Sequence, residues 1–286
     1  MPSMKAIKRR ITTVKNTQQI LKAMKLVATA KVQKFRIKMD NVRPMFNESR
    51  GFLEKGIYHQ DMMDSPYFSG REVKKTAYIV IAGERSLCGS YNSNILKMAL
   101  AHMNENGKNE RVITIGAKGK DYFVRRGKNH AAEYKKVLEN ASYSDAEAVA
   151  RHIVGLYNSE DEDERVDEVY IAYTQFETLL SHNPVVVKLL PFEEPEPGEG
   201  PQGEVIFEPD VLTYLNKAVP VYMAMYIYGA MSEAAVCEQA SRMTSMDAAS
   251  RNAEELVDKL TLQYNRQRQG AITQEISEIV GGANAI

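Results

Sequence analysis

The feature that most constrains the fold of this chain is a pair of long, heptad-patterned segments, one at each end. Pro2 and Pro44 bound the first segment, as expected at helix boundaries, and no proline follows Pro220 in the second. A helix of about 65 residues would extend over roughly 100 Å, farther than a globular protein of this length is wide. Since each apolar stripe needs a partner, we expect the two segments to fold back on each other as an antiparallel coiled coil.

Apolar residues in the first segment recur in alternating steps of four and three. Nine of eleven such positions are apolar, which gives the 3.5-residue period of a left-handed coiled coil. Ile20, Met24 and Val27 widen the stripe and predict that this helix contacts more than one neighbour. The eleven positions are Ile7, Ile11, Val14, Gln18, Leu21, Lys25, Ala28, Val32, Phe35, Met39 and Val42.

The second segment follows the turn signal Glu208-Pro209-Asp210 and is expected to form one long helix. Two or three shorter helices folded into a bundle are the alternative. Alanines such as Ala234 and Ala248 are slim enough to let a partner backbone come close. The stripe of this segment consists of Met225, Ser232, Val236, Met243, Met246, Ala253, Val257, Leu260 and Tyr264.

Composition places this chain of 286 residues among intracellular proteins without membrane spans. No run approaches the ~20 apolar residues that a span requires, and the first residues lack a signal-peptide core. Cys88 and Cys237 give neither a disulfide framework nor metal-ligand spacing. Five scattered histidines likewise predict no metal site.

Charge is distributed unevenly, although the formal net charge is zero. Residues 1–43 hold twelve Lys or Arg against one acid, Asp40, whereas acids cluster at 160–164 and 193–210. A helix this basic favours an anionic partner. Nucleic acid is one alternative, but aromatic residues for base stacking are missing apart from Phe35. A merely solvated basic face is another alternative, and we expect an acidic protein surface.

The final eighteen residues, 269–286, contain no Lys or Arg and only two acids, Glu275 and Glu278. A free helix end normally carries basic residues that offset the helix dipole. We therefore expect an apolar surface of another protein to enclose this end, and a tail packed on the chain's own helices is the alternative. The apolar stripe of the end consists of Ile272, Ile276, Ile279 and Val280.

Buried strands alternate with helices in the middle of the chain, which predicts a largely parallel, Rossmann-like sheet covered on both faces. A stretch rich in Pro, Gly and Glu then leads into the last helix. The expected strands are 77–82, 112–115, 169–173 and 185–190, and the expected helices are 94–103, 118–126 and 145–157.

No catalytic constellation accompanies this α/β segment. Residues 83–89 follow the first strand but match neither GxGxxG nor a phosphate-binding loop. Cys88 lies in that turn near Arg85, and it is either a nucleophile of lowered pKa or a small turn residue. Since no partnering base is apparent, we favour the turn residue. We expect a structural domain without cofactor or metal rather than a small-molecule enzyme.

Motifs at both ends of the chain are specific. The N-terminal ones are MKAIKRRI at 4–11 and KAMKLVA at 22–28, and the C-terminal ones are ASRMTSMDAA at 240–249, YNRQRQ at 264–269 and ITQEISEIV at 272–280. Together they resemble the gamma-subunit family of the bacterial F-type (rotary) ATP synthase over essentially the whole chain. Lys25 departs from that family, whose bacterial members usually have glutamate there.

This resemblance implies a central-stalk rotor with no catalytic site, cofactor or metal of its own. It implies that rotation of a membrane c-ring, driven by proton or sodium flow, is coupled mechanically to conformational cycling of three alpha and three beta subunits. It also implies an epsilon subunit alongside, no nucleic acid, and peripheral attachment to the cytoplasmic face of the bacterial cell membrane through the c-ring. A static coiled-coil tether or scaffold is the alternative function.

Contact residues follow from the same resemblance by position. The acidic segment of the hexamer would contact Lys22, Met24 and Lys25. The catch loops of the hexamer would contact Arg268, Gln269, Thr273 and Glu275. The foot on the c-ring would involve Phe207 and Glu208.

The expected fold is thus α/β with long helices, in which an antiparallel coiled coil of the N- and C-terminal helices joins a Rossmann-like globular domain. Five segments are expected: a coiled-coil helix at 1–58, a connector at 59–74, the α/β domain at 75–192, an acidic Pro/Gly linker at 193–208 and a second coiled-coil helix at 209–286.

Overall fold

The computed structural model describes four stretches of the chain. For residues 46–56 and 281–283 it describes the backbone alone. Most of the expected acidic linker, part of the expected connector, and Pro2 and Pro209 lie outside the described residues. The four stretches are 3–56, 63–192, 207–208 and 210–283.

Both ends of the chain form long helices, α1 (Met4–Gly56) and α6 (Val211–Ala283). Two compact units result. The coil unit comprises residues 1–29 and 242–286, and the α/β unit comprises residues 30–241. Each long helix therefore contributes to both units, and the alternative of several short C-terminal helices is wrong.

Prolines lie inside both long helices. Pro44 does not end α1, contrary to the expectation from the sequence, and Pro220 lies within α6. A proline in a helix removes one backbone hydrogen bond and costs about 3 kcal/mol. The many other turns of α1, a helix of 53 residues, offset that cost.

The start of α6 is capped by Asp210. The N–H of Thr213 donates to Asp210 Oδ1 at 2.8 Å, and the Thr213 hydroxyl donates to Oδ2 at 2.7 Å. These hydrogen bonds hold the pKa of Asp210 below its ordinary value. The cap satisfies a donor that the first turn of a helix otherwise leaves without a partner, so the turn signal in the sequence does mark the helix start.

The α/β unit is built on a five-stranded sheet of order β3-β2-β1-β4-β5. β1, β2, β3 and β4 pair in parallel, and β5 pairs antiparallel to β4. The elements are β1 (Thr76–Ile81), α3 (Tyr91–Asn106), β2 (Arg111–Ile115), α4 (Lys120–Val124), β3 (Asn129–Tyr134), η1 (Leu138–Asn140), α5 (Tyr143–Tyr157), β4 (Glu168–Phe176) and β5 (His182–Leu190).

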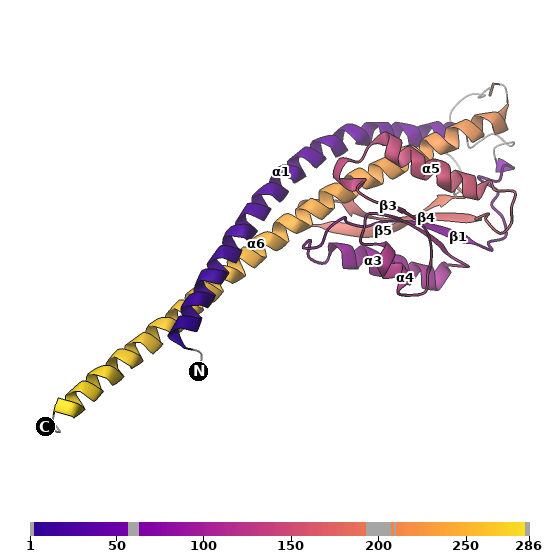
Figure 1. Ribbon diagram of the computed structural model, residues 1–286. Coiled ribbons are helices and arrows are strands. Elements are labelled where there is room, and N and C mark those ends of the chain that lie inside the picture. Colours follow the sequence, from indigo (N-terminus) through magenta and orange to yellow (C-terminus); the bar gives the residue numbers. More distant parts are fainter. Residues whose placement is uncertain (1–2, 57–62, 193–206, 209, 284–286) are drawn as a thin grey trace. The chain divides into compact units, whose positions relative to one another are not determined.

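Helices cover both faces of this sheet, as the apolar runs predicted. Ile79 and Ile81 of β1 face the core that also contains residues of α5 and α6, whereas Tyr78 and Val80 face α3 and α4 (Figure 1). All six residues of β1 are buried because the strand lies between two neighbours and two helical layers. A strand buried on both faces reads as a continuous apolar run, which is why β1 was recognisable in the sequence.

The edge strand β3 escaped sequence reasoning. It pairs only with β2, and most of its side chains are half-exposed. His130 meets Thr114 of β2, with the Thr114 hydroxyl 2.9 Å from the His130 Nε2 atom. Because an edge strand is stabilised by its ladder and by such local pairs, its sequence NHAAEY carries no apolar periodicity.

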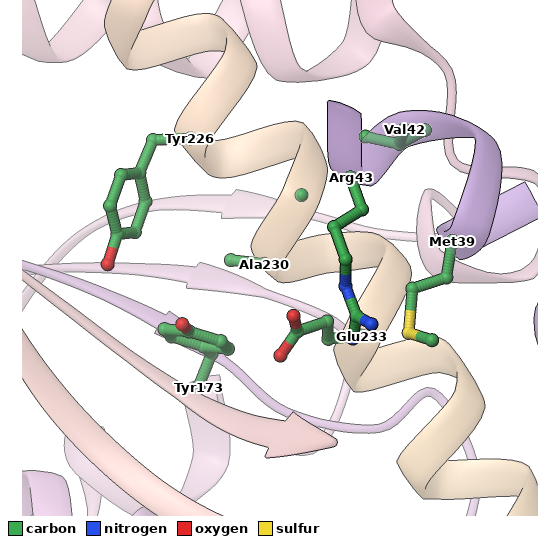
Figure 2. A pocket seen from close by; sticks show the side chains of 8 residues that line it. Met39, Val42, Arg43, Tyr173, Tyr226, Ala230 and Glu233 are labelled. Atoms are coloured by element: carbon green, nitrogen blue, oxygen red, sulfur yellow. The ribbon is translucent and has the colours of Figure 1, made fainter. Parts of the chain in front are cut away.

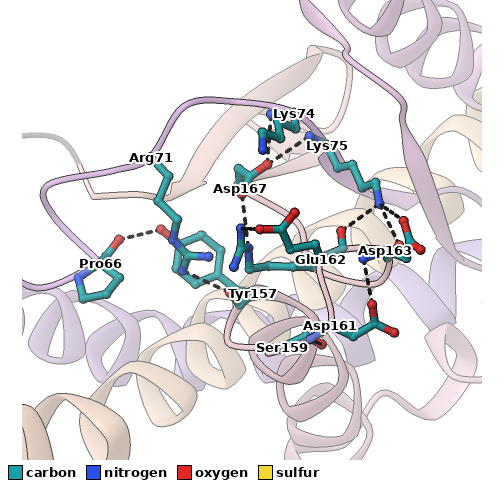
Figure 3. A network of polar contacts seen from close by, with 11 residues as sticks. Pro66, Arg71, Lys74, Lys75, Tyr157, Ser159, Asp161, Glu162, Asp163 and Asp167 are labelled. Carbon is teal, nitrogen blue, oxygen red and sulfur yellow. Dashed lines mark hydrogen bonds and ion pairs between the residues drawn. The ribbon is translucent and has the colours of Figure 1, made fainter.

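A buried carboxylate, that of Asp167, joins the beginnings of β1 and β4 (Figure 3). Its Oδ2 atom accepts hydrogen bonds from the backbone N–H groups of Lys74 at 2.9 Å and Lys75 at 3.1 Å. The ammonium of Lys75 in turn donates to the carbonyls of Glu162 at 2.9 Å and Asp163 at 2.8 Å. The acidic turn at 160–164 is thus fixed to the sheet through its backbone, while the side chain of Asp163 stays 99% exposed.

Tyr157 closes the same end of the unit. Its hydroxyl donates to the Pro66 carbonyl at 2.6 Å, and the Arg71 guanidinium lies 4.6 Å from the centre of its ring (Figure 3). Burial raises the pKa of Tyr157 to about 12, so its hydroxyl keeps its proton and remains a donor at neutral pH.

His102 makes the stability of the α/β unit depend on pH. It lies 3.0 Å from the Tyr78 hydroxyl through Nδ1, and burial lowers its pKa below the ordinary value. The unfolded chain therefore binds this proton more readily, so the contribution of His102 is present above about pH 6.5 and is lost as the pH falls below it. We expect the melting temperature to drop less between pH 7.5 and pH 5.5 in His102→Gln than in the parent chain. Parallel pH profiles in thermal denaturation would contradict this assignment.

Candidate functional site

Two apolar seams face each other in the coil unit. On α1, the heptad positions from Ile7 to Ala28 are all buried or half-buried, whereas most positions between them are exposed. On α6 the buried positions recur in the same alternating steps of four and three. The expected coiled coil is therefore present within this unit. The buried positions of α6 that follow this pattern are Met246, Ser250, Ala253, Val257 and Leu260, and Arg242 is buried as well.

Two polar contacts show that the helices of the coil unit run antiparallel. The side-chain amide of Gln18 donates to the Ser250 carbonyl at 3.5 Å, and the Lys25 ammonium lies 2.6 Å from Asp247 Oδ1. Numbers that rise along α1 fall along α6. Asp247 also lies 3.1 Å from Arg251, and the hydrogen bond from Lys25 holds its pKa below the ordinary value.

The three residues expected to contact an acidic segment have different surroundings. Lys22 is exposed, Met24 is half-buried, and the ammonium of Lys25 is directed to Asp247 within the chain. Ile20 is 61% exposed and Val27 is 59% exposed. Two of the three residues that widen the α1 stripe, Ile20 and Val27, are thus largely uncovered among the described residues, as a further neighbour would require.

The four residues expected at the catch loops are all exposed on the last turns of α6. The Thr273 hydroxyl donates to the Gln269 carbonyl at 2.9 Å, so it is partly used within the helix. Exposure among the apolar residues around them ranges from 46% for Ile272 to 71% for Ile279. The alternative of a tail packed on the chain's own helices is therefore wrong for these side chains. The four residues are Arg268, Gln269, Thr273 and Glu275.

Phe207 and Glu208 belong to the α/β unit, whereas the other expected contact residues belong to the coil unit. The ring of Phe207 packs against Tyr214 with 5.0 Å between the ring centres, and Glu208 is exposed. The structure thus brings seven of the nine residues into one unit and leaves these two in the other.

The chain's own helix fills the crevice in which a doubly wound sheet binds ligands. Such ligands bind at the carboxyl ends of the strands where the strand order reverses, here between β1 and β4. Hydrogen bonds fix α6 to α3, which follows β1, and to the carboxyl end of β4. They join the Tyr91 hydroxyl to the Ala234 carbonyl at 3.1 Å, the Phe176 N–H to Glu233 Oε2 at 3.1 Å, and the Cys237 thiol to the Thr174 carbonyl at 3.6 Å.

The part of α6 that fills this crevice is called the seat of α6. A small cavity remains beside it (Figure 2). Its volume of about 30 Å³ is far below the roughly 300 Å³ of a small-molecule pocket. Burial raises the pKa of Glu233, an effect that the hydrogen bond from Phe176 and the charge of Arg43 oppose. Figure 2 shows the Arg43 side chain extending from α1 toward the Glu233 carboxylate. The lining therefore serves to join α1, α6 and β4 rather than to hold a substrate.

Glu84 takes the place of an anion at the same edge of the sheet. Its Oε2 atom accepts a hydrogen bond from the Ala117 N–H at 3.2 Å, in the loop after β2. Burial raises the pKa of Glu84 despite the backbone hydrogen bonds. Gly116 lets the loop after β2 pass close to the Ala82 carbonyl oxygen. Its φ is +96°, and a Cβ there would lie 2.0 Å from that oxygen. Sequence reasoning missed Glu84 and Glu233, because nothing in the sequence marks which carboxylates fold inward.

We expect the isolated chain to bind no nucleotide. The crevice is occupied by α6, and the Ala117 N–H that could hold a phosphate is bonded to Glu84. Equilibrium binding of ATP with magnesium, followed by calorimetry, should give no saturable signal. A dissociation constant tighter than on the order of 1 mM would contradict this expectation.

The position of Cys88 fits a turn residue rather than a nucleophile. Its side chain is 2% exposed, and the thiol donates to the Arg85 carbonyl at 3.7 Å while accepting from the Asn92 amide at 3.1 Å. Neither group takes up a proton, and a buried thiol is out of reach of a substrate. Burial raises the pKa of the neighbouring Cys237.

In the described part of the chain, none of the helices has an apolar stretch that could span a lipid bilayer. No group of three or more His, Cys, Asp or Glu side chains is placed to hold a metal ion there.

Comparisons with known proteins cover the whole chain. A family model described as ATP synthase matches residues 3–286. The ATP synthase gamma chain of Desulforamulus reducens is 42% identical over 287 residues, covering 100% of both chains. The ATP synthase gamma chain of Pelotomaculum thermopropionicum is also 42% identical, with 100% of both chains covered.

Solved structures share the fold. The rotor of the Euglena gracilis mitochondrial ATP synthase matches with a TM-score of 0.71 at 18% identity, covering 94% of this chain and 98% of that chain. The central stalk and c-ring structure from Tetrahymena thermophila matches with a TM-score of 0.60 at 23% identity, covering 81% and 99%. The family match and the full-length relatives establish that the chain belongs to the ATP synthase gamma-chain family.

Proposed function

We propose that this gamma chain is the central-stalk rotor of its ATP synthase. As a gamma chain it is a non-catalytic subunit. It couples rotation of a membrane ring of c subunits to conformational cycling of three alpha and three beta subunits. The observation that carries this proposal is the coil unit, an antiparallel pair of helices whose outer faces differ in charge and hydropathy. The matching structures, a mitochondrial rotor and a central stalk with c-ring, support it.

The uneven charge and hydropathy of the coil unit explain how rotation can be coupled to the conformations of the catalytic subunits. The outer face of α1 carries Lys5, Lys8 and Lys22, whereas the end of α6 exposes Ile272 and Ile279. An asymmetric shaft presents a different face to each of three identical catalytic subunits, and each face favours a different conformation of the subunit it meets. This preference is a coupling free energy between sites, typically about 1–3 kcal/mol for each state. Turning the shaft moves the preferences around the ring.

Each group of contact residues meets a different part of the complex. Lys22 and Met24, with Lys25 beside them, meet an acidic segment of the hexamer; their support is the exposed cation of Lys22 and the uncovered apolar side chains nearby. Phe207 and Glu208 form the foot on the c-ring. The catch loops of the hexamer hold the exposed residues Arg268, Gln269, Thr273 and Glu275.

An epsilon subunit binds alongside, and the chain is held peripherally at the cytoplasmic face of the bacterial membrane through the c-ring. The bacterial relatives and the lack of a spanning helix in the described residues support this location. In this proposal, segments 1–58 and 209–286 are the coiled-coil helices of the rotor, and 75–192 is its structural domain. Segments 59–74 and 193–208 connect them.

Reconstitution tests the proposal. Purified alpha and beta subunits of a relative, mixed with this chain, should hydrolyse ATP faster than the same subunits alone, because the rotor forces each site out of its product-bound state. The matched control is the chain with residues 268–283 replaced by an alanine-rich helix of equal length. Equal rates with and without the chain would favour a static tether, which has no reason to change turnover.

A further inference from the structure

An ion pair between Lys25 and Asp247 joins the two helices of the coil unit at close range. The Lys25 ammonium lies 2.6 Å from Asp247 Oδ1, and Arg251 lies 3.1 Å from Asp247 Oδ2. The side chains of Lys25 and Asp247 are 42% and 33% exposed, so neither is fully buried.

We propose that Asp247 sets the register of the coil and withholds the Lys25 charge from outside partners. Apolar seams repeat every seven residues, so a slip of one heptad would keep apolar residues facing apolar residues. A polar pair at one position removes this ambiguity. A slip by seven residues would bring Asp247 opposite Gln18 or Val32 in place of Lys25, and neither is a cation.

The second half of the inference rests on the proposed rotor function. Lys22 and Lys25 lie one turn apart on α1, yet only Lys25 has an acid of α6 within ion-pair distance among the described residues. Lys22 is exposed to the surroundings. The cation that α1 offers to an acidic partner at this level is therefore Lys22, and Lys25 is a positioning residue that acts through Asp247.

Charge exchange tests both halves on the full chain. The variants are Lys25→Asp, Asp247→Lys and the double exchange, with Lys22→Asp as the matched control. Register is measured by the yield of a disulfide between Gln18→Cys and Ser250→Cys in a background where Cys88 and Cys237 are alanine. Partner coupling is measured in parallel as stimulation of ATP hydrolysis by alpha and beta subunits.

Each single reversal places like charges opposite each other and should lower the trapped fraction about fivefold, and the double exchange should restore it. ATPase stimulation should follow the same pattern. Lys22→Asp should leave the disulfide yield unchanged while lowering stimulation. These results together would support the inference.

Two outcomes would overturn it. A disulfide yield that the single reversals leave unchanged would mean that Asp247 does not set the register. Restored trapping without restored stimulation would mean that Lys25 contacts the partner directly. Should no variant, including the parent chain, stimulate hydrolysis, the proposed rotor function fails, and the disulfide yields still decide the register.

Discussion

Replacing Leu260 by aspartate is expected to separate α1 from α6 in the coil unit. Leu260 is 6% exposed and is the last buried position of the α6 seam. A carboxylate there would be buried without a partner, at a cost of about 3 kcal/mol or more. Since the seam is the main apolar contact of this unit, the N-terminal turns of α1 should open. Trypsin should then cleave quickly at the lysines and arginines between residues 5 and 22.

Leu262 supplies the control for that experiment. It lies two residues farther along the same helix but is 55% exposed, so Leu262→Asp buries no charge. Helix propensity changes equally in the two variants, and only the position relative to the seam differs. Equal cleavage rates of the parent, Leu260→Asp and Leu262→Asp chains would show that the seam does not hold α1 in place.

Removing the ring of Tyr91 is expected to loosen the seat of α6 in the α/β unit. Tyr91 is 4% exposed, packs with Cys88 and Cys237, and donates to the Ala234 carbonyl at 3.1 Å. Tyr91→Ala should lower the free energy of unfolding by about 3–5 kcal/mol, which is the range for loss of a buried aromatic ring. Tyr91→Phe should cost only about 1 kcal/mol, because the ring stays and one hydrogen bond is lost.

Urea denaturation of the α/β unit within the full chain measures both effects. Lys97→Ala is the matched control, since Lys97 is exposed on the same helix, α3. It should change the unfolding free energy by less than about 0.5 kcal/mol. A Tyr91→Ala variant as stable as the Lys97→Ala control would mean that the contact between α3 and α6 contributes nothing to the seat.

Elements with a clear hydrophobic pattern, such as α1 and β1, were predictable from the sequence. Elements that depend on pairing with a neighbouring element, such as β3, were not. All eleven heptad positions predicted for α1 are buried or half-buried. β1 was recognisable because it is buried on both faces, whereas β3 is an edge strand whose polar residues depend on pairing with β2. The end of α1 was misjudged at Pro44, because a local helix-breaking signal was outweighed by the rest of a long helix.

The site divides in the same way. The contact residues were assigned by position from the family that the terminal motifs resemble. Neither the heptad period nor the amino-acid composition identifies Lys22 or Arg268 as a contact residue. Asp247 was missed although a signal existed: once the helices are taken as antiparallel, the register places an acid of α6 opposite Lys25. Glu84 had no such signal, since its role depends on a loop conformation that only the folded sheet provides.

Direct observation of rotation tests the central claim. The parent chain, assembled with alpha and beta subunits fixed to a surface, would carry a bead attached in the α/β unit, far in sequence from the contact residues of the coil unit. We predict that ATP drives rotation of the bead in one direction, in three steps for each turn. Hydrolysis that proceeds while the bead stays still or moves without direction would contradict the proposal that this chain is the rotor.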